Sequence, residues 1–334
     1  FRDPFPFATL PGFPNTSRGK DYFSNFSYTR IIQPTLLNEF RFTAQRAHIG
    51  GLRPGVQLPG PEQLGIAITP DSVNGPTRIV FDQGTTILGF SPQGPQRVVD
   101  NTFAASDLVT WVFGRHHWKY GSGLSAYQNN TLFSFNSEGQ FDFVGVGGAG
   151  SQNAFADFLL GLPTFFSQDP QAPSNVRSKA IDAFAQDEWR ITQNFVLTLG
   201  LRYEYSTPKK DTLGRTFSLS VGQRSRVFTN APVSMVFPGD PGVPRGINFP
   251  DRNDWAPRVG FAWDVTGQGK MSLRGGIGTF YDILKAEDNF QFNGQPPFFS
   301  SVGFGFNPIV SNPDSPPLAL SQPYTAAGIP DPFP

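Results

Sequence analysis

Residues 184–204, FAQDEWRITQNFVLTLGLRYE, alternate apolar and polar side chains on either side of a short polar break at residues 192–194. Alternation with a period of two predicts β-strands, because successive side chains of a strand point to opposite faces. In the second half, one face carries Leu197, Leu199, Leu201, Tyr203 and Tyr205. The first half, taken from residue 181, follows the same pattern, and only Phe184 and Asp187 break it. The stretch therefore predicts an antiparallel hairpin with one apolar face.

Three further pairs of segments repeat this pattern around short turns. They are residues 21–32 with 36–47, residues 102–113 with 117–128, and residues 258–264 with 271–282. A weaker pair is formed by residues 140–144 and 164–171, which are joined through NAFADFLLGLP, a segment that predicts a short helix. We expect roughly ten strands, each of about 9–11 residues, the length that a tilted barrel strand needs to cross a membrane.

The connections between the predicted hairpins are much longer than the turns within them. Residues 48–101, 206–256 and 283–334 are rich in Gly, Pro, Asn and Ser, and they all fall on one side of the sheet. Short turns on one side and long external loops on the other are typical of outer-membrane barrels. A soluble β-sandwich with a Phe-rich core is the alternative, but its turns are normally short at both ends.

The bilayer explains why an apolar face alternates with a polar one. Lipid offers no hydrogen bonds, so a sheet crosses it only where every strand is paired, with an apolar face outward and a wet face inward. We therefore predict an all-β fold: a segment of an antiparallel up-and-down transmembrane β-barrel, located in the bacterial cell outer membrane. Outer-membrane lipid is its first expected partner.

The composition of the 334 residues supports this class of protein. The chain has 35 Phe, 36 Gly and 32 Pro but only 16% charged residues, against about 25% in ordinary soluble domains. Lys plus Arg and Asp plus Glu both number 26, so the net charge of zero provides no general attraction to nucleic acid. No apolar run is long enough for a membrane-spanning helix. We predict no nucleic-acid partner.

The alternation assigns side chains to two environments. The charged residues expected to face the lumen are Glu39, Arg41, Lys119, Glu188, Arg190, Arg202, Glu204, Arg258 and Arg274. The residues expected to face lipid or to form aromatic girdles at its two surfaces are Trp111, Trp118, Trp189, Leu197, Leu199, Leu201, Tyr203, Trp263 and Tyr281. Charges cost little on a wet wall, whereas at the lipid face near the bilayer centre they cost about 2–4 kcal/mol each.

Two motifs suggest chemistry but fit other interpretations better. Residues 145–150 match G-x-G-x-x-G, yet the buried apolar strands of a dinucleotide-binding sheet are missing around them, so a flexible glycine loop is favoured. His116 and His117 are adjacent and point to opposite faces of a strand, which makes a poor metal chelate. A turn role is favoured for His116 and a wall role for His117. We expect no enzyme, no cofactor and no metal site.

Several segments, taken in order, resemble a known family. FAQDEWRITQNFVLTLGLRYE, WAPRVGFAWDVTGQGKMSLRGGIGTFYD, LLNEFRF, GRHHWKYGSGLSAY and ADFLLGLP are similar to the β-barrel of TonB-dependent outer-membrane receptors, particularly the Oar-like branch. The resemblance covers residues 21–282. It implies a 22-stranded barrel, closed by its own plug domain, that imports a substrate with energy passed on by the TonB complex.

The chain departs from that family pattern at several points. It has no recognisable plug domain, TonB-box segment or final aromatic-ended strand, it begins without Met, and it ends in the turn-like GIPDPFP. We therefore expect residues 1–334 to be part of one barrel domain: an open curved sheet with unpaired edge strands.

The expected function is active uptake of an unidentified small molecule, glycan or peptide, without catalysis. Substrate contacts are expected in the long loops, for example in QFNGQPPFFSSVGFGFNP at residues 291–308. A passive porin-type channel and a soluble or surface-attached carbohydrate-binding module remain as alternatives, and the loops also leave adhesion open.

Overall fold

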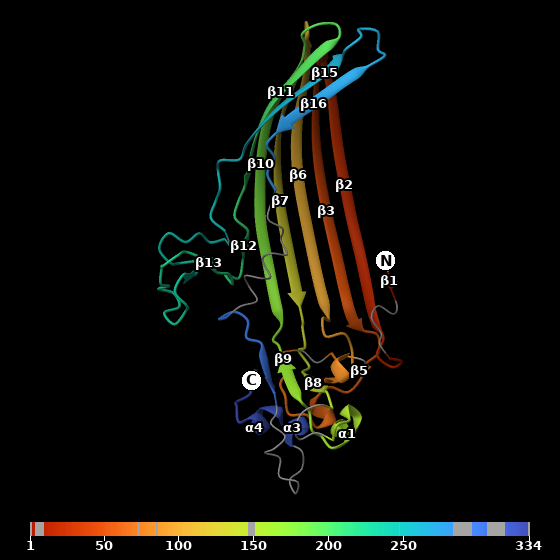
Figure 1. Ribbon diagram of the computed structural model, residues 1–334, viewed down its shortest axis with the longest axis vertical. Coiled ribbons are helices and arrows are strands. Elements are labelled where there is room, and N and C mark those ends of the chain that lie inside the picture. Colours follow the sequence, from red (N-terminus) through yellow and green to blue (C-terminus); the bar gives the residue numbers. More distant parts are fainter. Residues whose placement is uncertain are drawn as a thin grey trace.

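The computed structural model describes residues 2–3, 10–71, 74–84, 86–145, 151–246, 248–282, 296–305 and 318–332. Its main element is a tall, curved, antiparallel sheet (Figure 1). The long strands are β2 (Asn15–Gln33), β3 (Leu36–Pro54), β6 (Gln96–Phe113), β7 (His116–Phe133), β10 (Ala172–Arg190), β11 (Phe195–Ser206), β15 (Trp255–Asp264) and β16 (Ser272–Gly278). These pair in chain order, which confirms the four predicted hairpins and the all-β, antiparallel fold class.

The sheet is open within the part of the chain that the structure describes. At one edge, the two-residue strand β1 (Arg2–Asp3) pairs with only a short piece of β2, and at the other edge β16 pairs with β15. β12 (Lys210–Asp211) adds a second short ladder to β10 beyond the end of β11. The predicted open curved sheet is therefore confirmed.

Most of the strands are much longer than predicted. β2, β3 and β10 have 19 residues each, and β6 and β7 have 18. The loop boundaries predicted at residues 48 and 101 consequently lie inside β3 and β6. Alternation in hydrophobicity stops where the outward face becomes polar, but the backbone ladder continues because each strand still has paired neighbours. Hydrophobic periodicity therefore marks only part of each strand.

The prediction that residues 140–144 and 164–171 add two strands to the barrel is wrong. β8 (Gln140–Phe143) and β9 (Phe165–Gln168) do pair with each other, but they belong to a separate sheet of five short strands. Its other members are β4 (Arg78–Phe81), β5 (Thr86–Leu88) and β17 (Val302–Gly305). Strands of three or four residues are too short to cross a membrane, and most of their Phe side chains are buried in a local core instead.

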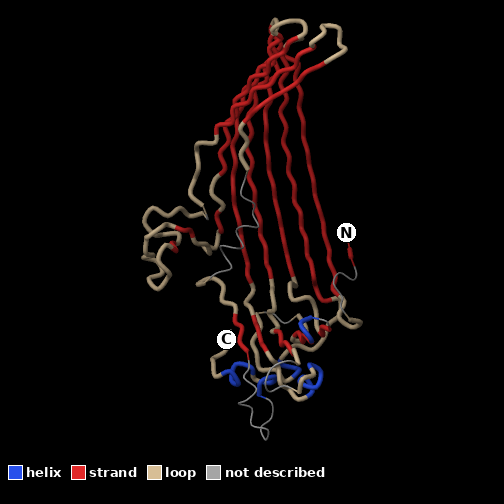
Figure 2. Tube along the Cα trace, viewed as in Figure 1, coloured by secondary structure: helices blue, strands red, loops and turns tan. Residues whose placement is uncertain are grey.

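This second sheet and the segments around it form an external subdomain at the loop end of the tall sheet (Figure 1). Figure 2 shows that the helices gather there, away from the short turns. The helical elements are η1 (Glu62–Leu64), η2 (Asp82–Gly84), α1 (Ala154–Leu159), α3 (Leu318–Ser321) and α4 (Pro323–Ala327). The predicted short helix is thus confirmed as α1, and the Asn153 side chain caps it by accepting a hydrogen bond from the Ala156 N–H at 3.0 Å.

The external subdomain has its own hydrophobic core, built from loops that are far apart in the sequence. The buried cluster consists of Ile66, Ile68, Ile79, Phe81, Phe141, Phe143, Ala154, Phe166 and Tyr324. The ring of Phe166 lies 4.8 Å from that of Phe141 and 5.6 Å from that of Tyr324, measured between centroids. Packed Phe rings therefore stabilise this subdomain, and the described parts of the loops that form it are folded structure.

The connection between β11 and β15 folds around a buried carboxylate. It contains the small ladder of β13 (Ser218–Leu219) and β14 (Met235–Val236). Asp240 accepts hydrogen bonds from the N–H groups of Phe237 at 2.8 Å and of Arg226 at 2.6 Å. Desolvation alone raises the pKa of Asp240, but these hydrogen bonds outweigh it and lower the pKa to about 2. The carboxylate thereby holds two parts of this loop together.

Candidate functional site

Strand pairing places the nine charged residues predicted for the lumen on one face of the tall sheet. Residues directly opposite each other in neighbouring strands share a face. One row runs from Glu39 through Leu108, Gly121 and Phe184 to Arg202. The other charged residues lie in neighbouring rows on this same face. Arg41 and Glu204 share one row, Lys119 and Arg258 a second, and Arg190 and Arg274 a third, while Glu188 lies in a row of its own. We call it the charged face; its exposure to a lumen stays a prediction.

Most of the charged residues on this face are paired. Arg202 contacts Asp182 at 3.1 Å and also Glu204, Lys119 lies 3.2 Å from Glu188, and Arg41 contacts Glu39. Because these side chains are partly exposed, each pair contributes little to stability. Within these pairs the local charges of the charged face are largely balanced.

Phe184, one of the two exceptions to the alternation, has a specific place on the charged face. Its ring covers Gly121 on β7, and the Arg202 guanidinium lies 5.8 Å from the ring centre. A Cβ at position 121 would stand 2.3 Å from Cε1 of Phe184. Glycine is therefore required where an aromatic ring from the next strand approaches the backbone so closely.

Gly121→Val is expected to lower the stability of the folded sheet by about 1–3 kcal/mol, the usual cost of overpacking. The Phe184 ring must move and lose its contact with Arg202. Heat-modifiable gel migration of the folded protein, followed over a temperature series, measures the change. Ser125→Val, on the same strand and face, is the matched control, and an equal loss in both variants would contradict the role given to Phe184.

The opposite face of the tall sheet is apolar near the short turns. Of the residues predicted to contact lipid or form girdles, it carries Trp111, Trp118, Trp189, Leu197, Leu199, Leu201, Tyr203 and Trp263. Leu199 and Leu201 are 43% and 46% exposed. Tyr281 is the exception, because β16 ends at Gly278 and the Tyr281 hydroxyl donates to the backbone carbonyl of Trp255 at 3.0 Å. The prediction that Tyr281 lies on a strand is therefore wrong.

Asp187, the second exception, lies on the apolar face and pairs with a histidine. His116 Nδ1 lies 2.6 Å from Asp187 Oδ2, and the His116 ring stacks on the rings of Trp189 and Trp118, with centroids 5.4 and 6.1 Å away. His116 is the first residue of β7, so the predicted turn role is wrong. His117 points to the charged face, 3.6 Å from Glu188, as adjacent strand positions require.

The apolar face ends abruptly about ten residues from the short turns. Arg177, Gln128, Asn101 and Arg46 lie opposite one another across four strands and form a polar row on that face. Arg46 donates to the Asn101 side chain at 3.2 Å. On β10 the apolar region therefore extends from Trp189 to about Lys179, which matches the length of a membrane-crossing strand.

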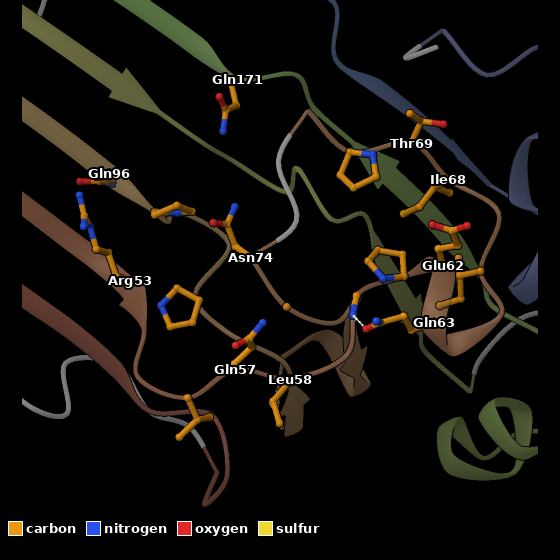
Figure 3. A pocket seen from close by; sticks show the side chains of 18 of the residues that line it. Arg53, Gln57, Leu58, Glu62, Gln63, Ile68, Thr69, Asn74, Gln96 and Gln171 are labelled. Carbon is orange, nitrogen blue, oxygen red and sulfur yellow. Dashed lines mark hydrogen bonds between the residues drawn. The ribbon is translucent and has the colours of Figure 1, made fainter.

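A large open hollow lies between the loop ends of the long strands and the external subdomain (Figure 3). Its volume is about 1520 Å³. The strands contribute Arg53, Gln96 and Arg97, and the connection between β3 and β6 contributes most of the rest, including Gln57 and Glu62. Figure 3 shows Arg53 and Gln96 on one side of the hollow and Glu62 and Gln63 on the other.

Asn74, which lines the hollow, is held in place by the partly buried carboxylate of Glu138. Glu138 accepts hydrogen bonds from the backbone N–H of Asn74 at 3.1 Å and from its side-chain amide at 2.9 Å. Burial raises the pKa of Glu138, while these hydrogen bonds act in the opposite direction. The contact connects the β3–β6 loop, which lines the hollow, to the β7–β10 loop.

The sequence did not single out the residues that line this hollow. They fell within the predicted loop 48–101, and substrate contact was instead expected in residues 291–308. Residues 291–295 and 306–308 lie outside the described part of the chain, and Val302–Gly305 forms β17 at the edge of the small sheet. The available signal was the density of Gln and Pro in GVQLPGPEQLGIAITP, residues 55–70.

Three features considered from the sequence are a metal site, a membrane-spanning helix and the glycine motif. Among the described residues, no group of three or more His, Cys, Asp or Glu side chains is placed to bind a metal ion. In the same ranges, no helix combines the length and the apolar character needed to span a membrane. Of the glycine motif at residues 145–150, only Gly145 lies within the described residues.

Comparison with known proteins agrees with the fold, that is, with a sheet that has one apolar and one charged face and with short turns on one side and long loops on the other. A family model described as "Outer membrane beta barrel domain" matches residues 1–334. No curated protein matches the chain. The chain belongs to this family of outer membrane β-barrel domains, and its place is the bacterial outer membrane.

Proposed function

We propose that this barrel is part of a TonB-dependent transporter that takes up a substrate actively and without catalysis. Membership of the family already indicates a transport or channel role. The observation that favours active uptake is the hollow of about 1520 Å³ at the loop end of the tall sheet. A receptor must bind its substrate before active transport begins, and a hollow bordered by a folded subdomain with its own hydrophobic core is suited to that binding.

The charged face supports the same proposal. Its ion pairs are balanced and partly exposed, as a wall is expected to be when it borders water or the polar surface of another domain. A plug domain and the TonB complex are the partners that this proposal requires. A passive porin is the alternative, because a charged wall is also compatible with a permanently open channel.

The permeability of the full-length protein to small sugars distinguishes TonB-dependent uptake from a passive porin. Purified protein in liposomes is expected to give no osmotic swelling with arabinose, and it is expected to bind the purified periplasmic domain of TonB. Swelling at the rate of a general porin measured in parallel would support the passive channel. Failure to bind the TonB domain would contradict the TonB-dependent mechanism.

A further inference from the structure

Two arginines, Arg53 and Arg97, line the hollow on its strand side. The Arg53 guanidinium lies over Gly50, with Nε 3.3 Å from the position that a Cβ would take there. Arg97 is the cross-strand partner of Gly50 and therefore shares that side of the sheet. Among the described residues, neither arginine side chain has an ion-pair or hydrogen-bond partner. Two guanidinium groups that line the same hollow without a counter-ion are suited to bind a carboxylate.

The rest of the lining is rich in amide side chains. Gln57, Gln63, Asn74, Gln96 and Gln171 all border the hollow. An amide side chain offers both hydrogen-bond donors and an acceptor, as does the backbone of an extended peptide. Glu62 lies across the hollow from Arg53 (Figure 3). The hollow is therefore positive on the strand side and negative on the η1 side.

The large volume of the hollow and the lack of aromatic residues among those that line it narrow the class of ligand further. A volume of about 1520 Å³ exceeds the roughly 300–1,000 Å³ of typical small-molecule sites, which are usually lined by hydrophobic and aromatic side chains. None of the described residues that line this hollow is Phe, Tyr or Trp, although the chain contains 35 Phe. A sugar ring would have no aromatic surface to stack on, which disfavours a glycan.

The lining loops are also stiff. Pro54, Pro61, Pro70 and Pro95 border the hollow, and proline fixes its backbone φ angle. A binding site made of restricted loops loses less conformational entropy when it takes up a flexible ligand.

We infer that the hollow binds short peptides with a free C-terminus, whose carboxylate is held by Arg53 and Arg97. The amide side chains bond the peptide backbone, and Glu62 faces its N-terminal half. This inference rests on the proposed function and names the substrate class for it.

Equilibrium dialysis of the full-length protein in detergent tests the inference. The probes are a synthetic random-sequence hexapeptide library with free C-termini and the same library with C-terminal amides, both quantified by mass spectrometry. The wild-type protein is expected to retain the free-acid library at least tenfold better. The Arg53→Gln/Arg97→Gln double variant is expected to lose this preference, whereas Arg224→Gln, an exposed arginine outside the hollow, should keep it.

Equal retention of the two libraries by the wild-type protein would overturn the inference. A preference unchanged in the double variant, or displacement of bound peptide by maltoheptaose, would overturn it as well. The dialysis needs neither TonB nor an energised membrane, so peptide binding and active uptake can fail separately: a swelling-competent protein that binds peptides would contradict only the transport mechanism.

Discussion

Leu201→Arg is expected to block assembly into the outer membrane, whereas Arg202→Leu, one residue further along the same strand, is expected to be tolerated. Leu201 lies on the apolar face opposite Ala185, midway between Trp189 and Lys179. A charge at that depth costs about 2–4 kcal/mol toward lipid. Arg202 lies on the charged face, so its replacement removes only its partly exposed contacts with Asp182 and Glu204.

The fraction of full-length protein that shows heat-modifiable migration in outer-membrane preparations measures this difference. Leu201→Met keeps the apolar character and volume of the side chain and serves as the control. The two positions are adjacent, so depth and strand context are the same, and only the face differs. Loss of assembly in Arg202→Leu but not in Leu201→Arg would invert the assignment of the lipid and lumen faces.

Phe166→Ala is expected to unfold the external subdomain while the membrane part of the sheet stays intact. The Phe166 side chain is completely buried and contacts the rings of Phe141, Phe304 and Tyr324. Removal of a buried Phe side chain costs about 3–5 kcal/mol. A small five-stranded sheet has few other contacts from which to recover such a loss.

Pulse proteolysis across a urea series reports the stability of the external subdomain, and heat-modifiable migration reports the barrel in the same samples. Phe165→Ala is the matched control, because Phe165 is the preceding residue of β9 and is 38% exposed. We expect a clearly smaller change for it. Joint loss of both signals in Phe166→Ala would show that the two sheets fold as one cooperative unit.

The membrane part of the fold was predictable because lipid imposes a simple pattern. A strand with one face toward hydrocarbon must alternate, and this alternation located all four hairpins and both faces. Phe184 and Asp187 broke the pattern for reasons that lie on neighbouring strands, namely Gly121 and His116. A single sequence does not show which residues will be cross-strand neighbours until the register is known.

The external subdomain and the hollow were less accessible to prediction. β4, β5, β8, β9 and β17 have only three or four residues, too few to show a period. The core joins segments separated by more than 200 residues, since its buried cluster contains both Ile66 and Tyr324. The hollow likewise takes its strand-side lining, Arg53 on β3 and Gln96 and Arg97 on β6, from two strands that are brought together only by their pairing.

The unusual length of β10 determines where the molecule meets its surroundings. Nineteen residues at about 3.3 Å each, tilted by about 40°, rise roughly 45–50 Å, of which the hydrocarbon layer occupies about 25 Å. About 20 Å of paired strand thus stands clear of the lipid as a rigid stalk. The hollow at the loop end of the sheet therefore stands well above the bilayer surface, and shorter strands would bring it closer to the lipid headgroups.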